Sequence, residues 1–295
     1  MTIPAIRRSS RLLNATKAVH ATDSLTRLIA CSVAAETLES LAAAVDRDRL
    51  DSELATINTL AAHDQLTTEV SSALAAILLH AQEAARVSGG LVDPVVGISG
   101  DVAPTGGQQD WRGHAPYFFD ADHRVLHVRR GTVLDLWNIG CAWAAEEIVA
   151  QVIVQDPAAS LAVVVGPAVV SVGAAWEIGE ALSQEYAALQ PPLRCGLRSF
   201  AVLQPGSFEA LPEHTDSQAG IEHVPHAGGP WWDRAAVGAE DAIQAVTFAL
   251  MAQRLGDSTF EHIVRAGGQA EFVGPRGGTP LRRRLRTPGW VPRES

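Results

Sequence analysis

Two short segments place polar side chains where the chain must turn sharply. In the first, GGLVDPVVG at residues 89–97, two glycines let the backbone approach a ligand closely and Asp93 supplies a carboxylate acceptor. In the second, VLDLWNIGCAWAAE at residues 133–146, a buried strand ends at Asp135 and a helix begins near Gly140. Backbone N–H groups at a helix start bind phosphate, so this corner suits a dinucleotide. Both segments also have a structural explanation, because Gly-Gly and Asp-Pro are common turn pairs and Asp135 can cap the helix.

Cysteine and histidine side chains supply the other reactive groups. Cys141 lies near the start of the same helix, where it is either a packed small hydrophobe or a thiol activated by the helix N-terminus. An unperturbed thiol, with a pKa of about 8.5, is mostly neutral at pH 7. His223 and His226 lie three residues apart, which suits a metal, but no third ligand is near them and a solvated loop is the alternative.

The composition indicates a chain with a large apolar core and an acidic surface. Of the 295 residues 47% are hydrophobic and 19% are charged, and the formal net charge is -10. Such a charge disfavours nonspecific binding to nucleic acid or to anionic lipid, so we expect neither as a partner. The basic cluster of Arg282, Arg283, Arg284 and Arg286 is either a solvated tail or a phosphate-binding group.

Cysteine usage and the N-terminal sequence indicate the compartment. Cys31, Cys141 and Cys195 are too few and too widely spaced for a disulfide framework or a paired-thiol metal site. No apolar run at the N-terminus is long enough for a secretion signal, and charged or polar residues interrupt every Ala/Val-rich stretch. We therefore expect a cytoplasmic protein with no membrane partner.

The periodicity of apolar residues predicts one mixed α/β unit in which helices and sheets interleave. Helices are expected over residues 34–46, 70–87, 139–154, 241–254 and 258–265. A further short helix is expected to begin after a cap at Ser52. Strands are expected over residues 116–119, 124–128 and 132–136 as an antiparallel meander, then 161–165, 168–172, 176–178, 200–203, 235–237 and 270–273. Residues 97–107 are expected to form a surface loop. We predict an N-terminal tail over residues 1–18, a domain over 19–275 and a basic C-terminal tail over 276–295.

The order of four segments resembles the FAD:protein FMN transferases of the ApbE type along roughly residues 20–270. The segments are AAETLESLAAAVDRDRLDSELATIN, SGGLVDPVVG, VLDLWNIGCAWAAE and VVVGPAVVSVGAAWEIG. The family has a DSEL segment before Asn, a G-x-F-D-P-T-V turn, a D-L-G-G-I-A-K-G-Y element, and G-G-D-x-x-x-x-G followed by W-x-V/I-G. The resemblance implies a T-fold-like α/β architecture, with antiparallel and mixed sheets flanked by helices.

The resemblance also implies an activity. These enzymes bind FAD with Mg²⁺, split the pyrophosphate and transfer FMN to a threonine or serine of a target flavoprotein. The metal neutralises charge around the attacked phosphorus. Carried over by resemblance, Leu91, Val92 and Asp93 line the cofactor-binding loop, Asp135 hydrogen-bonds the cofactor, and Asn138 offers a carbonyl oxygen to the metal.

The candidate catalytic residues are less well matched. Cys141 also falls in the cofactor site, where the family has a lysine or glutamate near the flavin. The family's H-I-I-D-P-x-T-G stretch falls on residues 223–229, where only His223 and a glycine are kept. Asp48 stands where some members place an aromatic residue against the cofactor, and its charge would repel a pyrophosphate unless it faces solvent.

The second metal motif, A-D-x-x-A-T-A-L, is degraded in either alignment. Anchored on a Leu-Gly pair, it falls on residues 245–252, so that Val246 replaces the aspartate and Leu250 the threonine. The alternative gives the carboxylate role to Asp241 and leaves Ala245 at the threonine position. Because Mg²⁺ prefers oxygen donors, it should bind weakly. The sequence thus predicts either a transferase with a modified site or a flavin-binding pseudoenzyme of the same fold, and an unrelated interaction protein is a third, more remote alternative.

Overall fold

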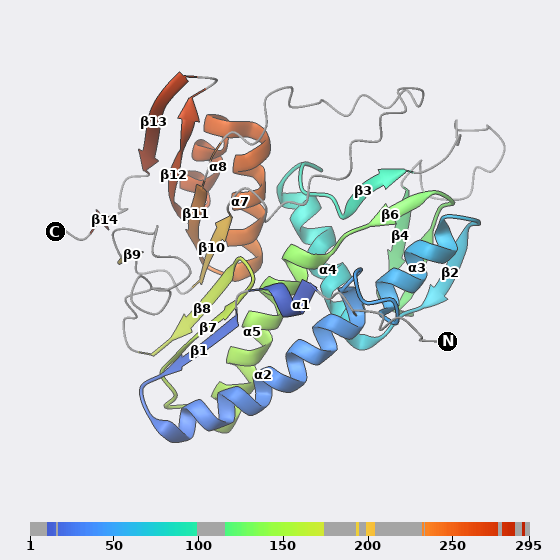
Figure 1. The fold of residues 1–295 in the computed structure, drawn as a ribbon, viewed down its shortest axis with the longest axis horizontal. Coiled ribbons are helices and arrows are strands. Elements are labelled where there is room, and N and C mark those ends of the chain that lie inside the picture. The colour runs from blue at the N-terminus through green and yellow to red at the C-terminus, as the bar shows by residue number, and fades with distance from the viewer. Residues whose placement is uncertain are drawn as a thin grey trace, which may run out of the picture.

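The computed structural model describes residues 11–15, 17–98, 116–173, 193–194, 199–203, 232, 234–276, 279–286 and 291–292. Helices and strands alternate along these residues, which confirms the predicted α/β class (Figure 1).

The largest sheet has seven strands, and every neighbouring pair in it is antiparallel. In spatial order its strands are β1 (Lys17–Ala21), β7 (Leu161–Val165), β8 (Ala168–Val172), β10 (Ser199–Leu203), β11 (Arg234–Ala239), β12 (Gln269–Arg276) and β13 (Thr279–Arg286). The apolar runs of β7 and β8 form the hairpin that the sequence predicts, and Gly166 at its turn has φ 51°. Strands β10, β11 and β12 also lie where expected.

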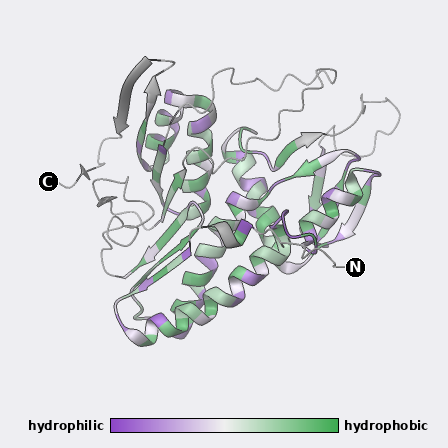
Figure 2. Ribbon diagram, in the orientation of Figure 1, coloured by the Kyte–Doolittle hydropathy of each residue, from purple (hydrophilic) through white to green (hydrophobic). Residues whose placement is uncertain are grey.

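Helices pack on one side of this sheet and on one another, and they bury the main core there (Figure 1). They are α2 (Ser24–Val45), α4 (Ser72–Val87), α5 (Trp137–Gln155), α7 (Ala242–Leu255) and α8 (Thr259–Arg265), with the 3-10 turn η1 (Gly256–Ser258) between the last two. Asp23, Ser71 and Asp241 accept a backbone N–H bond at the starts of α2, α4 and α7. Apolar colouring runs along α5 and α7, and Ala is the commonest residue in both (Figure 2). These short side chains let helices and strands approach closely, so aliphatic packing replaces aromatic packing.

Two smaller sheets lie at the other end of the molecule, beside α3 (Glu53–Ala61) (Figure 1). One contains β2 (Leu66–Glu69), β5 (Val125–Val128) and β4 (Tyr117–Asp120), and the other pairs β3 (Val95–Ile98) with β6 (Thr132–Leu134). The predicted three-stranded meander is therefore wrong in its last member. The reason is that β6 pairs with β3, whose last two residues, Gly97 and Ile98, fall in the predicted loop.

Both predicted tails contain regular structure. At the N-terminus α1 (Arg11–Asn14) precedes β1, whose first two residues fall within the expected tail. At the C-terminus β13 pairs with β12 and extends the large sheet, and β14 (Val291–Pro292) pairs with β9 (Leu193–Arg194). Backbone pairing therefore continues beyond the predicted boundary at residue 275. The predicted strand at 176–178 and most of the predicted loop at 97–107 lie outside the described residues.

One described helix, α2, is long and apolar enough to cross a membrane by length and composition. In its most apolar stretch 44% of the residues are buried inside the structure, and the helix packs on α5 and β1. A core helix and a membrane-spanning segment share these properties, so they do not by themselves indicate a membrane.

Candidate functional site

The two chemically suggestive segments of the sequence lie side by side in the structure. β3 follows the 91–93 loop, β6 precedes Asp135, and the two strands pair, with Val95 opposite Leu134. The pairing continues past the strands, since the backbone N–H of Asp135 donates to the carbonyl of Pro94 at 2.8 Å. The predicted cofactor residues Leu91, Val92, Asp93 and Asp135 therefore belong to one region.

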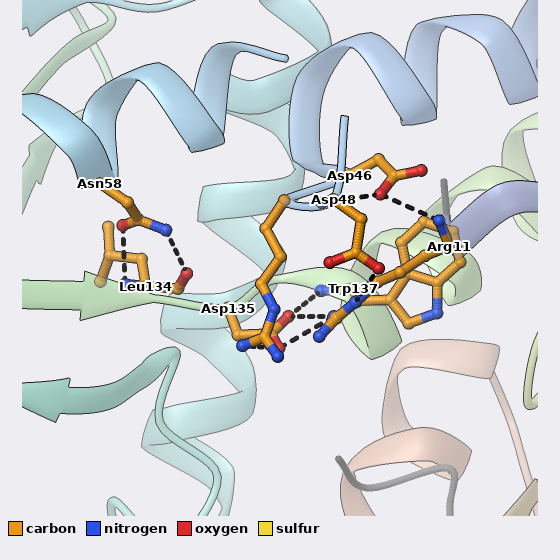
Figure 3. A network of polar contacts seen from close by, with 8 residues as sticks. Arg11, Asp46, Asp48, Asn58, Leu134, Asp135 and Trp137 are labelled. Carbon is orange, nitrogen blue, oxygen red and sulfur yellow. Dashed lines mark hydrogen bonds and ion pairs between the residues drawn. The ribbon is translucent and has the colours of Figure 1, made fainter. Parts of the chain in front are cut away.

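The Asp135 carboxylate is the centre of a polar network at this corner (Figure 3). Arg11 Nη1 donates to Oδ1 at 3.0 Å and to Oδ2 at 2.9 Å, and Arg47 Nη1 lies 3.3 Å from Oδ2. The backbone N–H of Trp137 donates to Oδ1 at 3.0 Å. Asp135 thus precedes the N-cap residue Leu136 and accepts from the first N–H of α5, and it also binds two guanidinium groups.

Asp46 anchors the chain that carries Arg11. The backbone N–H groups of Arg11 and Leu12 donate to Asp46 Oδ1 and Oδ2 at 3.1 and 3.2 Å, and the backbone N–H of Asp48 donates to Oδ1 at 3.1 Å. Asp46 is fully buried, and Asp48 Oδ2 lies 4.0 Å from Arg11 Nε. Two arginines face three aspartates here, so the network carries a formal charge of -1.

Asn58 fixes the strand that leads into the corner, and the sequence analysis did not identify it as a site residue. Its Nδ2 donates to the carbonyl of Leu134 and its Oδ1 accepts from the N–H of Leu134, both at 2.9 Å (Figure 3). Ser52 caps the same helix, α3, through a bond from the Ala55 N–H at 3.2 Å. The family pattern of DSEL before Asn is the signal that could have identified it, because the asparagine of that pattern is the residue that positions the corner.

The loop beside the corner has a backbone conformation that depends on glycine. Gly89 and Gly90 have φ of 63° and 85°, and no atom lies within 4 Å of where a Cβ would stand. Leu91 is half-buried, Val92 is buried, and one oxygen of Asp93 accepts from the N–H of Val95 at 2.7 Å. The loop can therefore present backbone to a ligand, whereas Asp93 is partly used in its own turn.

Cys141 lies one turn into α5 and is fully buried. Burial raises the pKa of its thiol, an effect that outweighs the attraction of the nearby Arg11. A Cβ on Gly166, at the β7–β8 turn, would lie 2.8 Å from Sγ. This environment favours a packed, neutral thiol and disfavours a nucleophile, so it argues against the predicted catalytic role.

The helix aligned with the second metal motif is apolar where the motif has oxygen ligands. Val246 is 0% exposed and Leu250 is 8% exposed, and both pack in the core. In the alternative alignment Asp241 caps α7, accepting from the N–H of Gln244 at 2.6 Å. Among the residues that the structure describes, no group of three His, Cys, Asp or Glu side chains can hold a metal ion.

Of the two remaining predicted residues, Asn138 is among those that the structure describes. Asn138 lies in the first turn of α5, where its carbonyl oxygen takes the direction of the helix's own hydrogen bonds, away from the helix start. That direction disfavours the predicted contact with a metal. His223 lies outside the described residues.

Comparison with known proteins agrees with this arrangement. The model of the ApbE family matches residues 14–194, more than half of the 295-residue chain. The chain belongs to the ApbE family. No curated protein matches the sequence.

Solved structures of similar fold come from three bacteria. The flavin transferase ApbE of Vibrio cholerae is 12% identical, with a TM-score of 0.65, and the match covers 94% of this chain and 95% of that one. The flavinyl transferase ApbE of Pseudomonas stutzeri, in its apo form, is 13% identical with a TM-score of 0.60, over 93% and 96% of the chains. The ApbE protein of Thermotoga maritima is 17% identical with a TM-score of 0.57, over 86% and 89%. At these identities the likeness establishes the ApbE fold.

Proposed function

We propose that this protein binds FAD at the Asp135 corner and transfers FMN from it to a threonine or serine hydroxyl of an acceptor flavoprotein. The observation that carries the proposal is the pairing of β3 with β6, which brings the 91–93 loop beside Asp135 in a chain of the ApbE family. Two of the solved structures it resembles are described as flavin or flavinyl transferases.

The residues at the corner suit a nucleotide in part. The open backbone at Gly89 and Gly90 gives access, and the Asp135 carboxylate is an acceptor for a hydroxyl or ring N–H group. Bound FAD would supply the pyrophosphate bond that is broken, releasing AMP as FMN passes to the acceptor hydroxyl, which loses its proton. In this proposal Asp135 orients the nucleotide, and α3 holds that corner in place through Asn58.

The described residues do not fit a magnesium ion at the second metal motif. Val246 and Leu250 offer no oxygen donor, and Asp241, the carboxylate of the alternative alignment, already caps its helix. We therefore assign no step to a metal on α7. The remaining cations at the corner are the guanidinium groups of Arg11 and Arg47.

The experiment is an assay of flavin binding and of transfer on the same protein. The full chain is titrated with FAD by fluorescence quenching, with and without Mg²⁺, then incubated with FAD and a flavoprotein domain bearing an acceptor threonine. Covalent FMN and AMP release support the transferase. Asp135→Ala should abolish FAD binding, whereas Arg27→Ala, which removes a charge from an exposed position on α2, should not. Wild-type affinity in a folded Asp135→Ala protein would overturn the site assignment.

A second function, flavin binding without transfer, is favoured by the loss of oxygen ligands on α7 and by the neutral thiol of Cys141. FAD binding with no AMP release at any Mg²⁺ concentration would favour it over the transferase. We also propose a reducing, cytoplasmic location, in which Cys31 and Cys141 stay as the free thiols seen here.

A further inference from the structure

The acceptor capacity of Asp135 is already used by the protein itself. An ionised carboxylate has about four acceptor positions. Arg11 Nη1 occupies both oxygens, Trp137 N–H adds a second contact to Oδ1, and Arg47 adds a second contact to Oδ2. A nucleotide that hydrogen-bonds Asp135 must therefore displace one of these three donors.

Arg11 is the donor that can leave with the least disruption. The Trp137 N–H belongs to the first turn of α5, and Arg47 directly follows Asp46, which is fully buried. Arg11, in contrast, begins α1, a helix of 4 residues, which is far too short to be stable by itself. Its backbone is attached through two bonds to the carboxylate of Asp46.

We propose that residues 11–15 form an autoinhibitory strap, in which Arg11 occupies the nucleotide site and is released when FAD binds. This inference rests on the proposed function, since it requires FAD to use Asp135. The strap lowers the apparent affinity for FAD by the fraction of molecules in which it is closed. An anion or a partner that binds the released arginine would therefore activate FAD binding.

Electrostatics and occlusion predict opposite effects of removing Arg11. The network has a formal charge of -1, and without Arg11 it becomes more acidic, which disfavours the pyrophosphate of FAD. Release of a competing side chain favours FAD. Tighter binding by an Arg11 variant can thus come only from the strap, and weaker binding shows that the positive charge of Arg11 favours FAD.

The test compares FAD dissociation constants of the wild type, Arg11→Ala, a chain lacking residues 1–15, and the charge control Arg27→Ala. We expect the first two variants to bind FAD about tenfold more tightly than the wild type and the control to match it. Equal or weaker binding by Arg11→Ala and by the shortened chain overturns the strap while leaving the proposed function intact. FAD binding by none of the four proteins overturns both.

Hydrogen exchange gives a second measurement that needs no variant. The N–H groups of Arg11 and Leu12 are bonded to Asp46 in the closed strap. Saturating FAD should speed their exchange in the wild type, because release of the strap breaks these bonds. Slower or unchanged exchange at both residues on FAD binding overturns the strap.

Discussion

The corner around Asp135 and the middle of α7 have diverged in opposite ways from the same family pattern. The corner keeps a carboxylate and surrounds it with further charged groups, which all find partners. On α7 the positions aligned with metal ligands hold Val246 and Leu250, which are packed in the core. The difference teaches that two regions matched to one family pattern can separate: polar side chains are kept in one while the other becomes hydrophobic core.

Cys141 belongs with the apolar side of this comparison although it follows the corner closely in sequence. It stands where the family pattern has a charged residue, and here it is buried under the β7–β8 turn. The boundary between polar site and core thus falls within the first turn of α5.

The strongest test of this contrast is to introduce a carboxylate on α7 at the position aligned with the family's aspartate. Val246→Asp places an acid at a fully buried position, where we expect it to cost about 4 kcal/mol of unfolding free energy. Urea unfolding measures the loss. If α7 is now core, Mg²⁺ will not restore the stability, because Leu250, at the position aligned with the threonine ligand, offers no side-chain oxygen.

The matched control is Leu250→Thr, alone and combined with Val246→Asp. The hydroxyl can bond to the helix backbone, so the single variant should lose less stability than Val246→Asp. Strong stabilisation of the double variant by Mg²⁺ would show that the metal site is latent in α7, and the contrast between the two regions would fail.

The next largest effect is expected at Asn58, which holds the polar corner in place. Asn58→Ala leaves both backbone groups of the buried Leu134 without their partner, which should cost about 2 kcal/mol. FAD affinity should fall as well, because Asp135 follows Leu134 directly. Asn58→Asp keeps the acceptor for the Leu134 N–H, so it should lose less stability and less FAD affinity than Asn58→Ala. Equal losses in the two variants would contradict the role given to the two hydrogen bonds between Asn58 and Leu134.

The sequence predicts those parts of the fold and of the candidate site whose signals lie within a single segment of the chain. Hydrophobic periodicity found α4, α5, α7 and the β7–β8 hairpin, because those signals lie within single segments. Of α2, which begins at Ser24, it found only the part from residue 34 onward. It missed the pairing of β3 with β6, because these strands are far apart in the sequence and a Gly-rich stretch lies between them. The loops at Asp93 and Asp135 were found from local chemistry, whereas the Arg11 contact, 124 residues away along the chain, left no local signal.

Gly166 tests whether the interior beside the corner is as tightly packed as its burial indicates. Gly166→Ala adds a Cβ at φ 51°, 2.8 Å from the sulfur of Cys141, and should cost about 2 kcal/mol in urea unfolding. In the double variant with Cys141→Ala the contact is gone and only the backbone strain remains. We expect part of the loss to be recovered relative to the sum of the single variants. Simple additivity would mean that the thiol does not fill the space under the turn.

The smallest effect is expected at Glu146, which connects the two regions. Glu146 lies on α5, and its Oε1 accepts a hydrogen bond from the Ala242 N–H at the start of α7. Burial raises the pKa of Glu146, with a further contribution from Asp241. Its folded pKa thus exceeds the unfolded value of about 4.3, so its contribution to stability is complete below that pH and is lost as the pH rises through the folded pKa. Glu146→Gln keeps the acceptor and should gain stability over the wild type as the pH rises from about 4 to about 7.

Urea unfolding of the wild type and of Glu146→Gln between about pH 4 and about pH 7 measures the gap between their free energies of unfolding. The pKa of His80, which also interacts with Asp241, is lowered by burial, and His80 therefore destabilises the fold as the pH falls. Both proteins share this histidine, so its effect largely cancels in their difference. A gap that narrows with rising pH would show that the carboxylate is better solvated than its burial indicates, and the apolar interior would then end before α7 begins.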